Sequence, residues 1–137
     1  ADELSARGAA AGVTIEARPV SVSIEGVPSS LRRAIENLAD NALKASPRGT
    51  RVVLASGVDT GWAWVAVADQ GEGIDPSALE RAGRRGLGLA IVRQIAQAHG
   101  GTLEAYRGRD KGSVLVIWLP LTEAPGSPPS DSPLQKV

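Results

Sequence analysis

Apolar residues recur at helical spacing in two parts of the chain. The first part covers residues 31–45, between a Ser-rich start that can cap a helix and a Pro-Arg-Gly stop. Its repeating apolar positions are Leu31, Ile35, Leu38, Ala42 and Ala45. The second part covers residues 87–99 and ends at Gly100-Gly101, where glycine permits the left-handed conformation that closes many helices. The sequence therefore predicts two amphipathic helices.

Runs of alternating, β-branched or aromatic residues predict strands around these helices. The runs span residues 13–24, 51–55, 62–68, 102–106 and 113–119. A loop of Gly, Asp and Thr joins the second run to the third, and a short loop joins the last two, so each pair predicts an antiparallel hairpin. Asp75-Pro76 predicts a further short helix over residues 75–81. This order favours an α/β (α+β) two-layer sandwich, in which helices cover one face of a mixed, largely antiparallel sheet.

Composition divides the 137 residues into three parts. Residues 1–12 are expected to end a preceding helix or linker, residues 13–121 to form one domain, and the Pro/Ser-rich residues 122–137 to form a disordered linker. Basic and acidic residues balance at 15 each, so we expect no nucleic-acid partner and no direct membrane contact. Trp62 and Trp64 share one strand face, and packing explains them better than stacking on bases.

Polar side chains form a narrow stripe on the first predicted helix. On a helical wheel, Asn37, Asn41 and Lys44 lie beside the apolar arc, at the edge of the buried face. Asparagine is a weak helix former, so two of them one turn apart require a reason. Amide oxygens suit a hard cation such as Mg²⁺, and an ammonium suits a phosphate. A solvated helix edge explains the same stripe without a ligand, so the stripe alone leaves both interpretations open.

Two glycine-rich segments follow the stripe. In "VADQGEGI", Asp69 stands at the end of a strand, and Gly71 and Gly73 leave room for a flat ligand near the backbone. In "RRGLGLAIVRQIAQAHGG", Gly86 and Gly88 lead into a helix whose free N–H groups can bind phosphate. Neither segment matches the dinucleotide fingerprint G-x-G-x-x-G after a strand or the P-loop G-x-x-x-x-G-K-[ST].

Together with "ENLADNALKAS" and "KGSVLVIWLPL", these segments resemble the N, G1, G2 and last-strand motifs of the catalytic ATP-binding domain of sensor histidine kinases. The resemblance covers residues 20–121. It implies the Bergerat ATP-binding fold, which this family shares with DNA gyrase, and it implies Mg-ATP as the ligand. It also implies transfer of the γ-phosphoryl group to a histidine on a separate dimerisation domain, and a downstream response regulator. A cytoplasmic location is implied too, either alone or as part of a membrane-bound sensor.

The resemblance assigns a role to each motif residue. Asn41, assisted by Asn37, is expected to hold Mg²⁺, and Lys44 is expected to neutralise phosphate charge. Asp69 is expected to accept a hydrogen bond from the adenine amino group, supported by the hydroxyl of Ser113. The remaining nucleotide contacts are expected from Gly71, Gly73, Ile74, Arg85, Gly86, Leu87, Gly88 and Leu89.

Asn37 also bears on the reaction. In ATP-hydrolysing relatives a Glu at this position is the general base for water, whereas Glu36 here lies about 100° away on the helix. An amide takes no proton from water at neutral pH, so the resemblance implies phosphoryl transfer, with catalysis by positioning and charge stabilisation. His99, the single histidine, stands where the family carries a structural His, so the acceptor is expected in another domain.

The segment between Gly73 and Gly86 is short for this family, whose lid is longer and contains a Phe that this chain lacks. Arg84 and Arg85 replace small residues there, and they suit either a phosphate clamp or a solvated basic turn. Weak transfer by the isolated domain is expected. Two other functions stay open on the sequence: a Bergerat-fold serine kinase that captures a sigma factor, and a nucleotide-binding module with little activity.

Overall fold

The computed structural model describes residues 12–18, 28–71, 87–107, 112–121, 128–129 and 132–133. Within these ranges the chain forms two helices and one sheet. The helices are α2 (Pro28–Ala45) and α4 (Leu87–Ala98), which confirm the two helices that the apolar spacing predicts. α2 begins three residues before the predicted range, so Ser29 and Ser30 lie inside the helix and do not cap it from outside. Pro28 instead occupies the first helical position, where its missing N–H costs nothing. The strands are β1 (Thr14–Arg18), β2 (Arg51–Asp59), β3 (Trp62–Ala68), β4 (Thr102–Arg107) and β5 (Ser113–Pro120).

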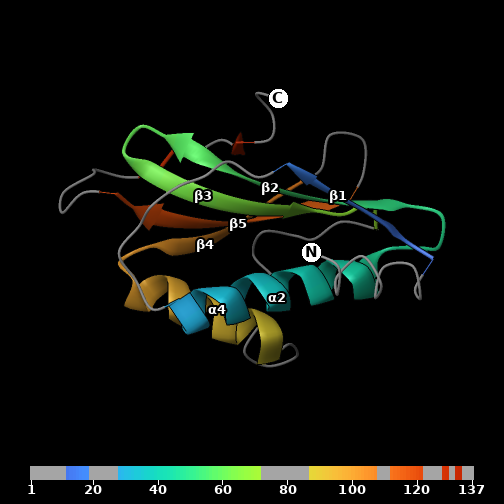
Figure 1. Ribbon diagram of the computed structural model, residues 1–137, viewed down its shortest axis with the longest axis horizontal. Helices are drawn as coiled ribbons and strands as arrows, with labels where there is room; N and C mark the ends of the chain where they lie inside the picture. Colours follow the sequence, from blue (N-terminus) through green and yellow to red (C-terminus); the bar gives the residue numbers. More distant parts are fainter. Residues whose placement is uncertain are drawn as a thin grey trace.

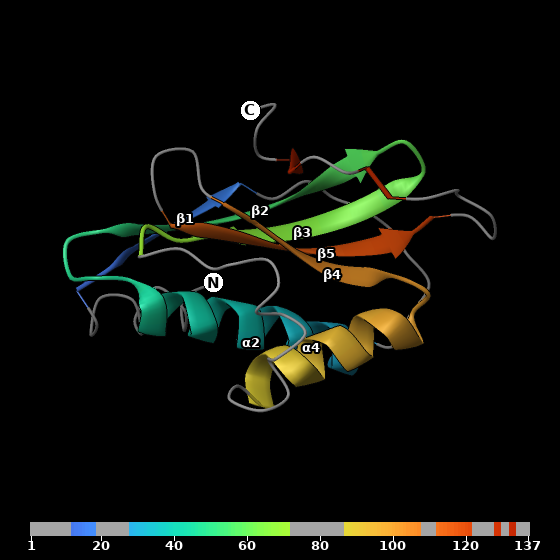
Figure 2. The ribbon, with the colours of Figure 1, turned by 180° about the vertical axis from the view of Figure 1, so that it is seen from behind.

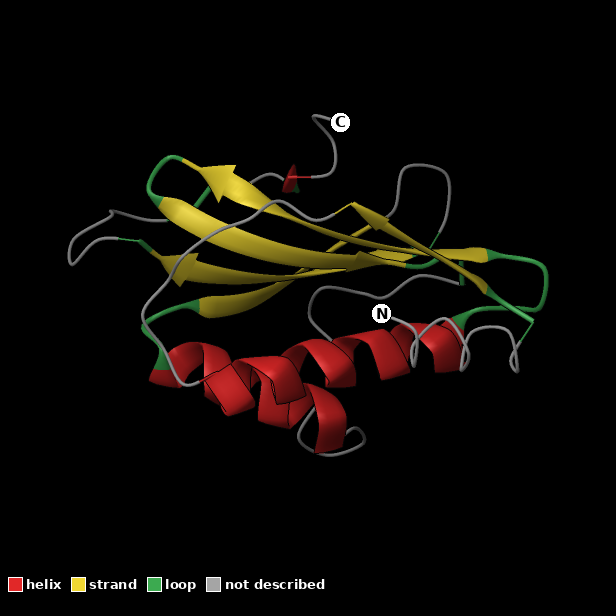
Figure 3. Ribbon diagram, viewed as in Figure 1, coloured by secondary structure: helices red, strands yellow, loops and turns green. Residues whose placement is uncertain are grey.

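The five strands lie in the order β1-β2-β3-β5-β4. β1 pairs with β2 in parallel, and the other three pairings are antiparallel. Both helices lie on one face of the sheet and run beneath it as a second layer (Figure 1, Figure 3). The predicted two-layer sandwich with a mixed, largely antiparallel sheet is therefore confirmed. Neither described helix is long and apolar enough to cross a membrane.

The hairpin of β2 and β3 differs from its prediction in the length of β2. The sequence predicts a strand that ends at residue 55, whereas β2 continues to Asp59 and leaves a connection of only Thr60 and Gly61. Both connecting residues have positive φ, 51° and 84°, which is the geometry of the two-residue hairpin turn that follows strand twist. Gly57 remains within the strand because the ring of Trp64 occupies its missing side-chain space, 2.6 Å from where a Cβ would stand.

Other expectations fall partly outside the described residues. The alternation that predicts a strand over residues 13–24 is described only as β1, and the short helix over residues 75–81 lies outside the described ranges. Within residues 122–137, the expected disordered linker, four prolines and serines are described: Pro128, Pro129, Ser132 and Pro133. Ser132 has only 1% of its surface exposed, and Pro133 is also buried.

The main core fills the space between the helices and the sheet. It combines one face of α2, including Leu38, and one face of α4, including Val92, with alternate strand residues such as Leu115 and Ile117. A second apolar cluster lies on the opposite face of the same sheet, where Trp62, Trp64 and Trp118 are its largest members. Successive side chains of a strand point to opposite faces, so β3 and β5 supply both cores.

The end of α4 is closed by a backbone motif that needs glycine. Gly100 has a φ of 78°, its N–H donates to the carbonyl of Gln97 at 3.0 Å, and the N–H of Gly101 donates to the carbonyl of Ala96 at 2.8 Å. This pair of bonds is the Schellman motif. The ring Nδ1 of His99 lies 2.8 Å from the carbonyl oxygen of Ile95, so His99 belongs to the helix end. The helix stop predicted from Gly100-Gly101 is confirmed.

Candidate functional site

Asp69 follows β3 directly, and its carboxylate is held by two donors. The backbone N–H of Gly71 donates to Oδ1 at 2.9 Å, and the hydroxyl of Ser113 donates to Oδ2 at 2.8 Å. The backbone N–H of Asp69 also donates to the carbonyl of Ser113 at 2.9 Å, which continues the pairing of β3 with β5. With 6% of its surface exposed, Asp69 is a buried acidic residue whose position is fixed from the backbone and from the side chain.

Two glycines allow this arrangement by close packing. A Cβ on Gly71 would collide with the carbonyl oxygen of Ala45, the last residue of α2. A Cβ on Gly112, whose φ is 90°, would collide with the carbonyl oxygen of Asp69. A larger residue at either position would therefore push Asp69 out of place or separate its loop from α2. Gly112 is a supporting residue that the sequence analysis missed; its signal is a glycine directly before the serine that opens a strand.

The contact of Gly71 with Ala45 places the end of β3 beside the C-terminal end of α2. Asn41 lies about one helical turn before Ala45, and Asn37 lies one turn earlier. Both asparagines are half-buried, and neither amide forms a hydrogen bond to another residue in the described part of the chain. The fold therefore places two half-buried amides within about two turns of the helix end that contacts the Asp69 loop.

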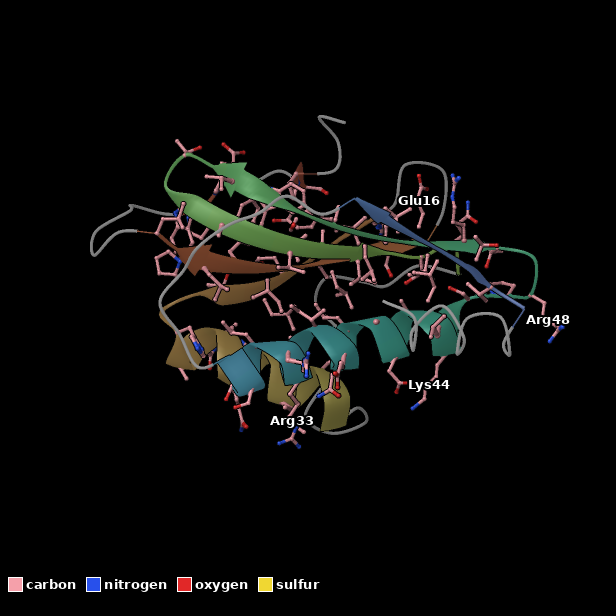
Figure 4. The ribbon with its side chains drawn as sticks, viewed as in Figure 1. Glu16, Arg33, Lys44 and Arg48 are labelled. Carbon is pink, nitrogen blue, oxygen red and sulfur yellow. The ribbon has the colours of Figure 1, made fainter. Side chains whose placement is uncertain are left out.

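Lys44 belongs to the same stripe and differs from the asparagines in its surroundings. Its ammonium forms an ion pair with Asp40 at 3.1 Å, and 78% of its side chain is exposed. The side chain extends from α2 away from the sheet (Figure 4). Exposed ion pairs of this spacing stabilise a helix by only about 0.3–0.5 kcal/mol, so an anionic ligand can compete for the ammonium.

Some of the remaining predicted site residues lie within the described ranges and others lie outside them. Gly73, Ile74, Arg85 and Gly86 lie outside the described residues. Leu87 and Gly88 form the first turn of α4, where the first N–H groups of a helix have no partner within that helix. The side chain of Leu89 is buried in the main core, with 8% of its surface exposed.

Gln70 is a second supporting residue that the sequence analysis missed. Its side-chain Oε1 accepts a hydrogen bond from the backbone N–H of Arg51 at 2.8 Å, which ties the loop after β3 to the first residue of β2. No sequence signal pointed to it, because its partner lies 19 residues away along the chain.

The amide oxygens of Asn37 and Asn41 are donors that suit a hard cation. No group of three or more His, Cys, Asp or Glu that could hold a metal ion occurs among the described residues. Amide oxygens are hard ligands that Mg²⁺ accepts, and a magnesium ion bound through one or two protein groups usually completes its shell with phosphates and water. The half-buried Asn37 and Asn41 fit such a site.

A buried carboxylate at a strand end lies beside a helix with two half-buried amides on a two-layer sandwich, an arrangement that suits a nucleotide-binding domain. Its family follows from comparison with known proteins. The family model of histidine kinase-, DNA gyrase B- and HSP90-like ATPases matches residues 26–123. The histidine protein kinase DivJ of Caulobacter vibrioides is 37% identical over 122 residues, which cover 78% of this chain and 20% of DivJ.

Two solved structures resemble the chain over most of their length. The mycobacterial sensor histidine kinase MprB superposes with a TM-score of 0.71 at 33% identity, covering 87% of this chain and 93% of that chain. The ATP-binding domain of PrrB from Mycobacterium tuberculosis superposes with a TM-score of 0.69 at 31% identity, covering 89% and 91%. The chain therefore belongs to this ATPase family, as an ATP-binding catalytic domain of the sensor histidine kinase type. It spans about a fifth to a quarter of the length of the curated relatives it matches.

We expect Ser113→Ala to lower the free energy of unfolding by about 1–3 kcal/mol, because it removes the donor to a buried carboxylate oxygen. Ser113→Thr keeps the hydroxyl and should lose less than Ser113→Ala. Urea denaturation followed by tryptophan fluorescence measures both variants. Equal stability of Ser113→Ala and the unchanged chain would show that the hydroxyl does not hold Asp69.

Proposed function

We propose that this chain binds Mg-ATP between the C-terminal half of α2 and the end of β3, and donates the γ-phosphoryl group to a histidine of a separate phosphoacceptor domain. The observation that carries the proposal is the buried carboxylate of Asp69, fixed by Gly71 and Ser113 beside the end of α2. Membership of the ATPase family supports nucleotide as the ligand.

Asp69 supplies the selectivity for adenine in this proposal. An ionised carboxylate is an acceptor with about four lone-pair sites, and the described donors to it are one N–H and one hydroxyl. The remaining capacity suits the exocyclic amino group of adenine, which donates. Guanine presents a carbonyl oxygen at the corresponding position, and two acceptors facing each other repel. Gly73 would leave space for the base, whereas the space expected beside Gly71 is filled by the carbonyl oxygen of Ala45.

Asn41 and Asn37 would hold Mg²⁺ through their amide oxygens, and Lys44 would leave Asp40 to meet a phosphate. When bound, the ion neutralises charge on the phosphates. The first N–H groups of α4 would face the phosphates together with Gly86, Leu87 and Gly88. The buried side chain of Leu89 leaves its backbone as the group that can contribute. The roles of Gly73, Ile74, Arg85 and Gly86 rest on the resemblance of the sequence motifs.

Transfer is favoured over hydrolysis by what surrounds Asn37. Asn37 is half-buried on the stripe that carries Asn41, whereas Glu36 is exposed. The carboxylate of Glu36, the nearest in sequence to Asn37, therefore lies on a different face of α2. Because position 37 carries an amide that takes no proton from water, an acceptor imidazole would attack the γ-phosphorus. A P–N bond forms, the P–O bond to ADP breaks, and ADP leaves. We place this reaction in the cytoplasm, with a response regulator as the next acceptor.

Thermal unfolding with and without nucleotide tests the metal site. Mg-ATP at about 100 times its Kd should add about 2.7 kcal/mol to the free energy of unfolding. Asn41→Ala should remove the part of this increase that depends on Mg²⁺, because it deletes an oxygen ligand. Gln97→Ala deletes an exposed amide on α4 and serves as the control. Equal Mg²⁺ dependence in Asn41→Ala and Gln97→Ala would contradict the assignment.

Incubation with γ-labelled ATP and a histidine phosphoacceptor domain tests the reaction. We expect the acceptor domain to become labelled, and we expect this label to be lost in acid and to survive in base, because a phosphoramidate bond is labile in acid and stable in base. Little ADP should form when no acceptor is present. Asn41→Ala should abolish the labelling. Acid-stable label would identify a serine kinase, and multiple turnovers of ATP without an acceptor would identify a hydrolase.

A further inference from the structure

All three tryptophans of the chain lie on the sheet face opposite the helices. Trp62 and Trp64 come from β3 and Trp118 from β5, and Trp64 is directly paired with Trp118 across the strands. They are 4%, 8% and 0% exposed, respectively. We refer to these three residues with Tyr106 as the tryptophan face. Neither described helix lies on this side of the sheet, so the helices do not account for the burial of the rings (Figure 1, Figure 2).

Part of the C-terminal segment lies on this same side. Ser132 is 1% exposed and Pro133 is buried, and Pro128 and Pro129 are half-buried. The short segment at residues 132–133 stands on the side of the sheet away from α2 and α4 in both views (Figure 1, Figure 2). Two residues near the end of a polar, proline-rich segment are therefore shielded from solvent over the outer face of the sheet.

The chain leaves the sheet at one corner of the tryptophan face. Trp62 is paired with Pro120, and the N–H of Leu121 donates to the carbonyl of Gly61 at 2.9 Å. The 11 residue-to-residue steps from Leu121 to Ser132 can span about 34 Å in a polyproline conformation. Five strands at about 4.8 Å spacing are about 19 Å wide, so the segment is long enough to cross the sheet.

The indole N–H of Trp62 has no hydrogen-bond acceptor among the described residues. Its indole Nε1 is buried and has no acceptor in the described part of the chain, whereas Nε1 of Trp118 donates to the hydroxyl of Tyr106 at 3.0 Å. Indole N–H groups are donors only, and proline residues carry a backbone carbonyl and no N–H. Extended proline-rich segments dock in aromatic-lined grooves of this chemistry at low entropic cost.

We propose that the tryptophan face is a binding site for an extended proline-rich segment, that residues 122–137 of this chain are its occupant, and that Nε1 of Trp62 donates to a carbonyl of that segment. Because the segment is tethered at Leu121, its effective concentration at the face is in the millimolar range, so weak intrinsic affinity is sufficient. A proline-rich segment of another protein would have to compete with it. This site is independent of the proposed nucleotide site, which lies where α2 meets β3.

Tryptophan fluorescence tests the proposal directly, because it reports on no other part of the chain. A chain that ends at Leu121 should emit at longer wavelength than the full chain and be quenched more strongly by acrylamide. A synthetic peptide of residues 122–137 should reverse both changes, and a peptide with its prolines replaced by alanine should not. Trp62→Phe in the shortened chain should weaken peptide binding about fivefold, as the loss of one hydrogen bond requires.

A point variant tests the occupant without shortening the chain. Ser132→Lys should raise acrylamide quenching, since a charged side chain does not fit a position that is 1% exposed. Val58→Lys, at a residue that is 53% exposed on β2, adds the same charge and should leave the quenching unchanged. Circular dichroism checks that each variant is folded, and Ser132→Lys keeps the test informative if the shortened chain does not fold.

Unchanged emission and quenching in both the shortened chain and Ser132→Lys would overturn the proposal. Quenching of the full chain that falls as protein concentration rises, together with a dimer in sedimentation, would overturn it in favour of a second copy of the chain on this face.

Discussion

The carboxylate of Asp69 joins three parts of the chain that are distant in sequence. It accepts from Gly71, which packs against the last residue of α2, and from Ser113, which opens β5. A buried carboxylate without these donors would be costly, and so would a buried hydroxyl or N–H without the carboxylate. One set of contacts therefore fixes the pairing of β3 with β5, the packing of the end of α2 and the candidate purine site.

Local patterns were sufficient to predict the elements that depend on periodicity. The apolar spacing of α2 and α4, the glycines that end α4 and the two hairpins are all readable from short windows of sequence. The length of β2 could not be predicted from a short window of sequence, because Gly57 stays in the strand only when Trp64 of the neighbouring strand covers it. Local propensity places a glycine in a turn, and the cross-strand contact overrides it.

The residues of the candidate site also fall into those that local sequence motifs predict and those that they do not. Asp69 and Ser113 could be named from motifs, and they do meet in the structure. Gln70 could not, because it acts through a contact with a residue that is remote in sequence. Gly112 had a sequence signal, the glycine before the strand-opening serine, but its contact with Asp69 follows from the three-dimensional structure. The pairing of Lys44 with Asp40 is local in sequence, yet the wheel that grouped Lys44 with the asparagines did not separate an exposed ammonium from half-buried amides.

The sheet serves different purposes on its two faces. The helix side holds the main core and ends at the carboxylate and amides of the candidate nucleotide site. The other side collects the aromatic residues of a chain that has only three Trp, one Tyr and no Phe. Concentrating nearly all aromatic area on one face gives that face an apolar surface that needs a cover. The family resemblance accounts for the first face and does not account for the second.

The most direct test of the role of Asp69 is the ratio of affinities for ATP and GTP in Asp69→Asn. The amide has the size of the carboxylate, and the hydroxyl of Ser113 can reverse to accept from it, so the variant should fold. Because the amide presents a donor, the preference for ATP measured by competition calorimetry should disappear, while Asp40→Asn on α2 should keep it. A preference for ATP that persists unchanged in Asp69→Asn would contradict the account.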